Sequence, residues 1–271
     1  MMAFSTNFDK LVIDSWDRAI FRNITTGEIL AIFDQIKEGL IENTSEQRTQ
    51  TGLRGVVLNT LNRNKATNIS LTNGYLVASG IGVQTGSGVE EASEENKFIV
   101  PEVEYIDVKS DTTKIVLRRT PVGTTGAEIP FIYKANKDLS QGKKFAISAT
   151  ASATTFALDV KTRTITLPTG AFQAGDVVIV MYDYEDTVGK KISNRADTFG
   201  GTVELIIDAT THDICDDSIL YHTKIVAPKL TVDSNFTISV GDEPATHTVA
   251  GKCSTDICST SQELWNWFIV E

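Results

Sequence analysis

Short runs in which apolar and polar residues alternate, each bounded by turn-forming residues, recur along the chain and constrain its fold more than any other feature. Residues 19–24 and 28–33, for example, flank Thr25-Thr26-Gly27, in which the glycine can adopt the positive φ of a hairpin turn. No segment longer than about 15 residues keeps the 3.6-residue period of an amphipathic helix. The pattern predicts a protein made mainly of short strands.

The same pattern continues to the end of the chain. Beyond the first two runs, it predicts strands at residues 56–61, 69–72, 75–78, 98–108, 114–118, 129–133, 143–150, 155–160, 163–167, 176–184, 202–207, 220–227, 229–232, 236–240 and 263–270. Many short strands without long helices between them favour an all-β fold, an antiparallel β-sandwich or barrel, over a parallel α/β sheet. One or two short helices are expected beside the strands.

The dipeptide Asn73-Gly74 is the strongest single turn signal in the chain. Asn-Gly is the preferred pair for a two-residue type I′ turn, because both central residues of that turn need a positive φ. We therefore expect residues 69–72 and 75–78 to form a hairpin around it.

Four segments depart from plain alternation. Residues 80–95 are rich in glycine and then in acidic residues, which predicts an exposed loop with a short acidic helix. A short helix is also expected within residues 208–218, and the spacing in residues 29–40 suits one or two helical turns as well as a strand. The apolar run at residues 177–181 predicts a strand that is buried on both faces.

The chain is acidic, with 25 Lys and Arg against 35 Asp and Glu and a net charge of −10. Proteins that wrap nucleic acid need Lys and Arg to displace counterions, so this composition argues against tight nucleic-acid binding. A negative surface repels phosphate, and it also keeps a protein in solution. The sequence contains neither a secretion-signal pattern nor a run of about 18 apolar residues, so we expect synthesis in a cytoplasm and no membrane insertion.

Cysteine and histidine are the candidate metal ligands. Cys215, Cys253 and Cys258 are an odd number for a disulfide framework, so free thiols are expected, although Cys253 and Cys258 could pair locally. Zinc sites usually show paired cysteines and paired histidines at short spacing. His212 and Cys215 lie close in sequence, with His222 further on, but that paired spacing is missing. No metal site is predicted, and a metal-dependent enzyme built on this region is the weakest of three hypotheses.

Phosphate-binding and nucleophilic motifs are also missing. The glycines of the 80–95 segment have the spacing GxGxxxGxG in place of the dinucleotide-binding GxGxxG; they are Gly80, Gly82, Gly86 and Gly88. The sequence has neither a GxxxxGK[ST] phosphate loop nor the GxSxG nucleophile elbow. The histidines that could act as a general base are His212, His222 and His247. The sequence therefore predicts neither a cofactor-binding residue nor a catalytic triad.

Acidic pairs and terminal aromatic residues are the remaining candidates. The acidic pairs are Glu90-Glu91, Glu94-Glu95 and Asp216-Asp217. Glycosidases place two carboxylates across a cleft, whereas these pairs lie in polar runs typical of a solvated surface. Trp265, Trp267 and Phe268 could stack on a sugar or a base, but beside apolar residues they predict a buried closing strand with both tryptophans on one face. No catalytic residue is predicted, and we do not expect an enzyme.

A series of short motifs gives the first 90 residues a recognisable order. The motifs are Thr26-Gly27-Glu28-Ile29-Leu30, Ile41-Glu42-Asn43 with Glu46, Gly52-Leu53-Arg54-Gly55, Leu61-Asn62-Arg63-Asn64-Lys65-Ala66, Thr72-Asn73-Gly74-Tyr75-Leu76 and Gln84-Thr85-Gly86. In order and character they resemble the opening of phage tail-tube subunits. The stretch from Ala196-Asp197-Thr198-Phe199 to Ala227-Pro228-Lys229 is compatible with the second half of such a subunit.

The resemblance implies both an architecture and a role. Residues 1–100 and 186–271 would form a tail-tube β core, and residues 101–185 would be an inserted β module. The subunits would close into hexameric rings that stack into a tube for DNA passage. The implied partners are copies of the chain, the tail tape-measure protein, other tail proteins and DNA as a non-specific passenger, all in the virion tail. The second hypothesis is another phage virion β protein, namely a head-decoration, neck or receptor-binding component.

Overall fold

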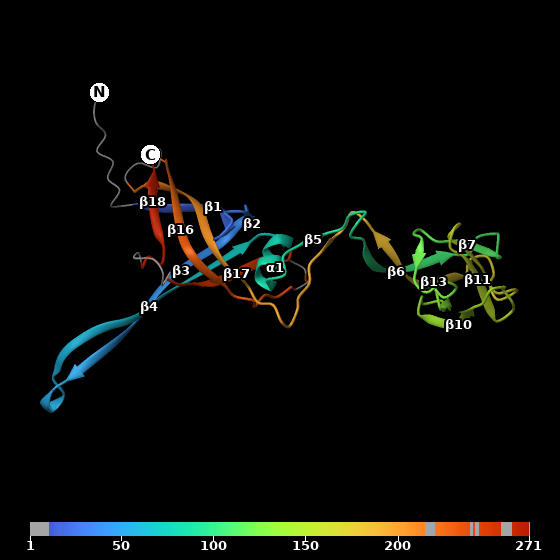
Figure 1. Cartoon of the computed structure of the whole chain (residues 1–271), viewed down its shortest axis with the longest axis horizontal. Helices are drawn as coiled ribbons and strands as arrows, with labels where there is room; N and C mark the ends of the chain where they lie inside the picture. The colour runs from blue at the N-terminus through green and yellow to red at the C-terminus, as the bar shows by residue number, and fades with distance from the viewer. Residues whose placement is uncertain (1–10, 215–219, 239–240, 242–243, 256–261, 271) are drawn as a thin grey trace, which may run out of the picture. The chain divides into compact units, whose positions relative to one another are not determined.

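A computed structural model describes residues 11–214, 220–238, 241, 244–255 and 262–270. Over these residues the chain is mostly β-strand, with one short α-helix and one 3₁₀ turn, so the predicted all-β fold is confirmed (Figure 1). The chain divides into two compact units. Unit 1 comprises Met1–Glu90 and Ile192–Glu271, and unit 2 comprises Glu91–Lys191.

Unit 1 is built on one curled antiparallel sheet. Its elements are β1 (Leu11–Asn23), β2 (Ile29–Phe33), β3 (Ile36–Thr51), η1 (Leu53–Gly55), β4 (Val57–Asn73), α1 (Ala78–Thr85), β15 (Thr202–Asp213), β16 (Leu220–Val232), β17 (His247–Cys253) and β18 (Asn266–Val270). The strand order is β2-β1-β15-β16-β17-β4-β3, and β18 pairs with the first part of β16. The sheet curls far enough for Trp16 of β1 to pack against Gly39 of β3, where a Cβ would overlap the indole.

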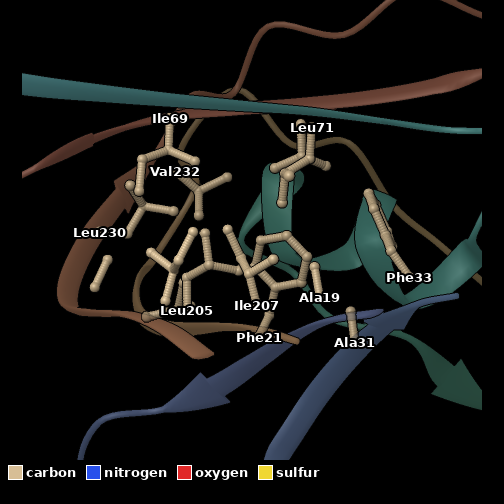
Figure 2. Close-up of a cluster of buried hydrophobic side chains, with 14 of the residues drawn as sticks. Ala19, Phe21, Ala31, Phe33, Ile69, Leu71, Leu205, Ile207, Leu230 and Val232 are labelled. Carbon is tan, nitrogen blue, oxygen red and sulfur yellow. The ribbon is translucent and has the colours of Figure 1, made fainter. Parts of the chain in front are cut away.

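The core of unit 1 lies on the inner face of this sheet. Along β15, Leu205 and Ile207 are fully buried while the residues between them are partly exposed, as strand alternation requires. The rings of Phe21 and Phe33 meet edge to face with their centroids 5.2 Å apart. Figure 2 shows these side chains converging below Leu71 of β4. Full burial of each such side chain contributes about 1.5–3 kcal/mol, so this cluster is a main source of stability.

Unit 2 has its own sheet and core. The remaining strands of the chain are β5 (Glu90–Glu91), β6 (Phe98–Asp107), β7 (Lys114–Val116), β8 (Pro121–Val122), β9 (Phe131–Ala135), β10 (Gln141–Ile147), β11 (Thr155–Asp159), β12 (Thr164–Thr166), β13 (Val177–Asp186) and β14 (Lys190–Lys191). The sheet order is β6-β13-β9-β10-β11-β12-β7, with β8 beside β13, and β5 pairs separately with β14. The β10–β11 pair is parallel, whereas its neighbours are antiparallel. Phe145 and Phe156 are buried at the centre of this core.

A buried polar network fixes one loop of unit 2 to its sheet. The carboxylate of Glu104 accepts hydrogen bonds from the Tyr182 hydroxyl and from the backbone N–H of Arg118, the latter at 2.9 Å. The Tyr182 oxygen in turn accepts from the backbone N–H of Arg119 at 3.1 Å. Burial and the neighbouring carboxylate raise the pKa of Tyr182. The network keeps a buried carboxylate hydrogen-bonded, which a core position requires.

The predicted hairpin at Asn73-Gly74 is wrong. Asn73 ends β4, and its buried side chain accepts a hydrogen bond from the Gln35 N–H at 3.0 Å and donates one to the Tyr75 carbonyl at 3.0 Å. The Gly74 N–H donates to the Gln35 carbonyl at 2.7 Å. Both residues therefore bind the start of β3, and the chain continues into α1 without turning back as a strand.

The prediction of an exposed loop at residues 80–95 is wrong in its first part. Residues 78–85 form α1, and Gly80 and Gly82 are buried within it. A Cβ at Gly80 would lie 2.7 Å from atoms of both Phe33 and His247, so glycine lets the helix approach the core closely. Because small residues take the place of large apolar ones, the helical period is invisible in the sequence.

Two further predictions of local structure are corrected. Residues 208–213 belong to β15 and are not helical; Ala209 and Thr211 are buried, so threonine serves as an inward-facing residue of the strand. Residues 215–219 lie outside the described residues. The run 177–181 is buried on one face only, because Val178 and Val180 point into the core of unit 2 while Met181 is exposed.

Three strand boundaries also differ from expectation. The ambiguous segment 29–40 contains β2 and the start of β3, with no helical turn. Residues 220–227 and 229–232 form the single strand β16, which continues through Pro228. Residues 236–238 are not in a strand, and residues 239–240 lie outside the described residues.

Candidate functional site

The hairpin of β3 and β4 extends well beyond the sheet of unit 1 (Figure 1). As far as the pair Asn43 and Thr67 it belongs to the sheet, and Thr67 is fully buried. Beyond that pair, all side chains of residues 44–66 are exposed apart from Gly52 and Ala66. We call residues 44–66 the arm. Nothing in unit 1 covers either face of the arm. A two-stranded ribbon without a core of its own is only marginally stable in water.

The arm ends in a turn at residues 52–55, which we call the tip. The Gly52 N–H donates to the Val56 carbonyl at 2.7 Å, and the Gly55 N–H donates to the Gly52 carbonyl at 3.2 Å. Arg54 and Gly55 both have a positive φ, of 62° and 77°, respectively. Glycine adopts this conformation without strain, which explains why Gly55 follows Arg54 at the tip.

The arm carries exposed apolar side chains, one of them at its tip. Leu53 is 87% exposed, the highest value among the large apolar residues that the structure describes. The other exposed apolar side chains of the arm are Val56, Val57, Leu58 and Leu61. A single exposed apolar side chain is ordinary, but a contiguous group of this kind marks an interaction surface.

The arm is also basic. Among residues 44–66, four are basic and one, Glu46, is acidic, which gives the arm a net charge of +3 within a chain of net charge −10. The basic residues are Arg48, Arg54, Arg63 and Lys65. None of them forms an ion pair with another described residue. The arm therefore presents apolar and cationic groups together to solvent.

Those candidate metal ligands that the structure describes are not assembled into a site. His212 lies on β15 and His222 on the neighbouring β16, and Cys215 and Cys258 lie outside the described residues. Cys253 is a free thiol in the core of unit 1, where burial raises its pKa to about 11. In the described part of the chain, no three His, Cys, Asp or Glu side chains are placed to share a metal ion.

His247 has a structural role between α1 and β17. Its Nε2 lies 2.7 Å from Oε1 of Gln84, and its Nδ1 accepts a hydrogen bond from the Val77 N–H at 3.3 Å. Burial lowers the pKa of His247. This arrangement requires the neutral tautomer that carries its proton on Nε2, so the side chain is used to hold a helix against the sheet.

The acidic and glycine-rich candidates are dispersed. Glu91 pairs with Lys190 at 2.6 Å on the surface of unit 2. The loop of glycines forms α1 and its C-terminal turn, where Gly86 has a φ of 71°. Asp216-Asp217 lies outside the described residues.

The terminal aromatic residues split between two environments. Trp265 is half-buried, and its Nε1 donates to Oδ1 of Asn43 at 3.1 Å, close to the base of the arm. Trp267 and Phe268 lie on β18, which closes against β16 as predicted. The predicted burial of these two residues is wrong, because both remain exposed.

The described residues thus form an all-β protein with an exposed, basic and partly apolar arm. The model of the YomU/Tube protein family matches residues 11–265, so the chain belongs to this family of phage tube-type proteins. The predicted resemblance to phage tail-tube proteins is thereby confirmed. No curated protein gave a match. None of the helices in the described ranges has the length and apolar character needed to span a membrane.

The sequence predicted one strand of the arm, at residues 56–61, but neither its partner strand nor the ribbon that the two form. Strand alternation identifies strands with one buried face, and neither face of the arm is buried. Two weaker signals were present. Residues 43–51 are rich in β-branched threonine and contain no proline, and the turn motif Gly52-Leu53-Arg54-Gly55 separates them from a second proline-free run, which begins with apolar residues.

Proposed function

We propose that the protein is a subunit of a phage tail tube, and that it assembles with copies of itself into stacked hexameric rings through which DNA passes. The observation that carries this proposal is the arm, with its uncovered apolar tip. Transfer of apolar surface from water into an interface is favourable, so a protein that keeps Leu53 almost fully exposed gains stability by association. Membership of a phage tube family supports the same conclusion.

The form of the arm favours a closed or repeating assembly. Each chain has one arm, and an arm that binds a different surface on the next copy makes a heterologous contact. Such contacts generate a ring if the rotation between copies closes, and a helical filament if it does not. A tube of stacked rings needs one contact that closes each ring and another that joins successive rings.

The charge of the chain suits the passage of DNA. A net charge of −10 repels phosphate, so DNA would slide past the wall of a tube without binding tightly. We include the tail tape-measure protein and other tail proteins among the partners, the virion tail as the location, and the host cytoplasm as the place of synthesis. Within this proposal, residues 101–185 are a β module inserted into the tube-type core.

Sedimentation velocity over a range of protein concentrations tests self-assembly. The wild-type chain should form species much larger than its 29.6 kDa monomer. Leu53→Asp should shift the distribution toward the monomer, because a buried carboxylate at the tip is costly. Val188→Asp is the matched control, since Val188 of unit 2 is 85% exposed, and it should sediment like the wild type. A wild-type chain that stays monomeric at every concentration and salt would contradict the proposal.

A further inference from the structure

A hollow of about 440 Å³ lies in unit 1 where β1 meets the start of β3. Its walls combine aromatic and aliphatic side chains with two carboxylates. The lining residues are Trp16, Asp17, Asp34, Gln35, Ile36, Lys37, Gly74 and Tyr75. Polar and apolar groups both line the hollow, and Lys37 adds a cation beside the carboxylates. Its size is in the range of about 300–1,000 Å³ that is usual for binding pockets.

The two carboxylates of the hollow are held in place. Asp17 accepts hydrogen bonds from the hydroxyls of Ser15 and Thr210, each at 2.6 Å. Asp34 accepts a hydrogen bond from the Tyr75 hydroxyl. Because their neighbours orient them, these carboxylates would lose little rotational freedom on pairing with a cation.

The tip of the arm has the complementary chemistry. Leu53 offers an exposed aliphatic side chain that fits against Trp16 and Ile36. Arg54 offers a guanidinium, which pairs strongly with carboxylates and also stacks on aromatic rings. The turn at Gly52–Gly55 places the two side chains next to each other at the tip of the arm.

The tip and the hollow of one chain cannot meet. The hollow lies at the base of the same hairpin, beside Ile36 at the start of β3, whereas the tip follows Thr51 at its end. At about 3.3 Å per residue, the intervening strand spans about 50 Å. Figure 1 shows the arm leading away from the rest of unit 1. Contact between a tip and a hollow must therefore join two copies.

We infer that the tip of the arm, through Leu53 and Arg54, inserts into the hollow lined by Trp16, Asp17 and Asp34 of a second copy. This inference rests on the proposed function and names the two surfaces that would meet in it. The contact is heterologous: each copy donates one tip and accepts another, so the same interface repeats along an assembly.

Two variants that each remove one side of the contact test the inference. The tip variant is Leu53→Asp/Arg54→Glu, and the hollow variant is Asp17→Lys/Asp34→Lys. Each alone should self-associate about tenfold or more weakly than the wild type, because each places like charges or a carboxylate in the interface. Mixed in equal amounts, they should associate into species of at least twice the 29.6 kDa chain mass. The unchanged tip of the hollow variant meets the unchanged hollow of the tip variant, and the reversed charges of the other pair also match. Sedimentation velocity measures all three samples.

Exchanging the charges of Asp34 and Arg54 tests whether these two residues pair, and a surface variant of unit 2 serves as the control. Asp34→Arg combined with Arg54→Glu in one chain should restore the association that Arg54→Glu alone loses, which a folding defect would not produce. Lys161→Glu changes the charge of an exposed residue of unit 2 and should leave association unchanged. Circular dichroism and thermal unfolding confirm that every variant is folded.

The outcomes separate this inference from the proposed function. If the wild type assembles and both variants assemble equally well, or if the mixture of variants stays monomeric, the tip–hollow contact is overturned while self-assembly stands. If the wild type itself never assembles, the proposed function fails. Loss of assembly in each variant, with recovery of association in the mixture, supports the contact.

Discussion

The imidazole Nε2 of His247 lies 2.7 Å from Oε1 of Gln84, so a buried hydrogen bond joins β17 to α1 inside unit 1. The other ring nitrogen accepts from the Val77 N–H, and this second contact is lost when another proton binds the ring. Burial accordingly lowers the pKa of His247 below its ordinary value of 6.5. The fold of unit 1 therefore depends on a neutral histidine.

This relationship predicts a loss of stability in mild acid. Below about pH 6.5 the unfolded chain binds a proton at His247 that the folded chain does not, so the free energy of unfolding falls as the pH drops toward the lower folded-state pKa. The slope is at most about 1.4 kcal/mol per pH unit for one group. Urea unfolding at low protein concentration between pH 7.5 and 5 measures it. His247→Gln should lose this slope, while His222→Gln, which changes an exposed histidine, should keep it.

A second prediction concerns the closure of the sheet in unit 1. A methyl group at position 39 would overlap the Trp16 indole, so Gly39→Ala should lower the free energy of unfolding by about 1–3 kcal/mol through overpacking. Gly201→Ala is the matched control, because nothing lies within 4 Å of a Cβ at that position. Equal stabilities of the two variants in urea unfolding would show that β1 and β3 do not pack as described.

A third prediction concerns the polar network of unit 2. Tyr182→Phe removes a hydroxyl that donates to the buried carboxylate of Glu104, and an unsatisfied buried group costs about 1–3 kcal/mol. Hydrogen exchange of the full chain should show faster exchange of amides in β6 and β13. Tyr184→Phe keeps the ring that faces the Arg119 guanidinium, so its exchange should match the wild type. Unchanged protection in Tyr182→Phe would mean that the network does not stabilise unit 2.

The sequence identified the strands whose side chains are sorted between a core and solvent. Alternation placed β6 and the first half of β15 correctly, because residues such as Leu205 and Ile207 are buried while their neighbours are not. The same rule could not identify the distal part of β3, in which both faces are exposed and polar. The candidate site lies in this part of the chain, so the sequence indicated the fold more completely than the site.

Other errors came from tertiary contacts that override local preference. Asn73 favours a turn by itself, but in the fold its side chain binds the backbone at Gln35 and Tyr75. Gly80 and Gly82 lower the intrinsic helix propensity, yet their small size allows α1 to pack on Phe33 and His247. Such contacts join residues far apart in the chain, and no local pattern encodes them.

Electron microscopy of the concentrated full-length protein in negative stain tests the central claim most directly, since it separates polymers, closed particles and monomers in one image. We expect rings with six-fold symmetry, stacked into tubes. The Leu53→Asp variant should lose these tubes, and the Val188→Asp variant should keep them. Fields of isolated monomers at every concentration and salt, or tubes unaffected by Leu53→Asp, would contradict this claim.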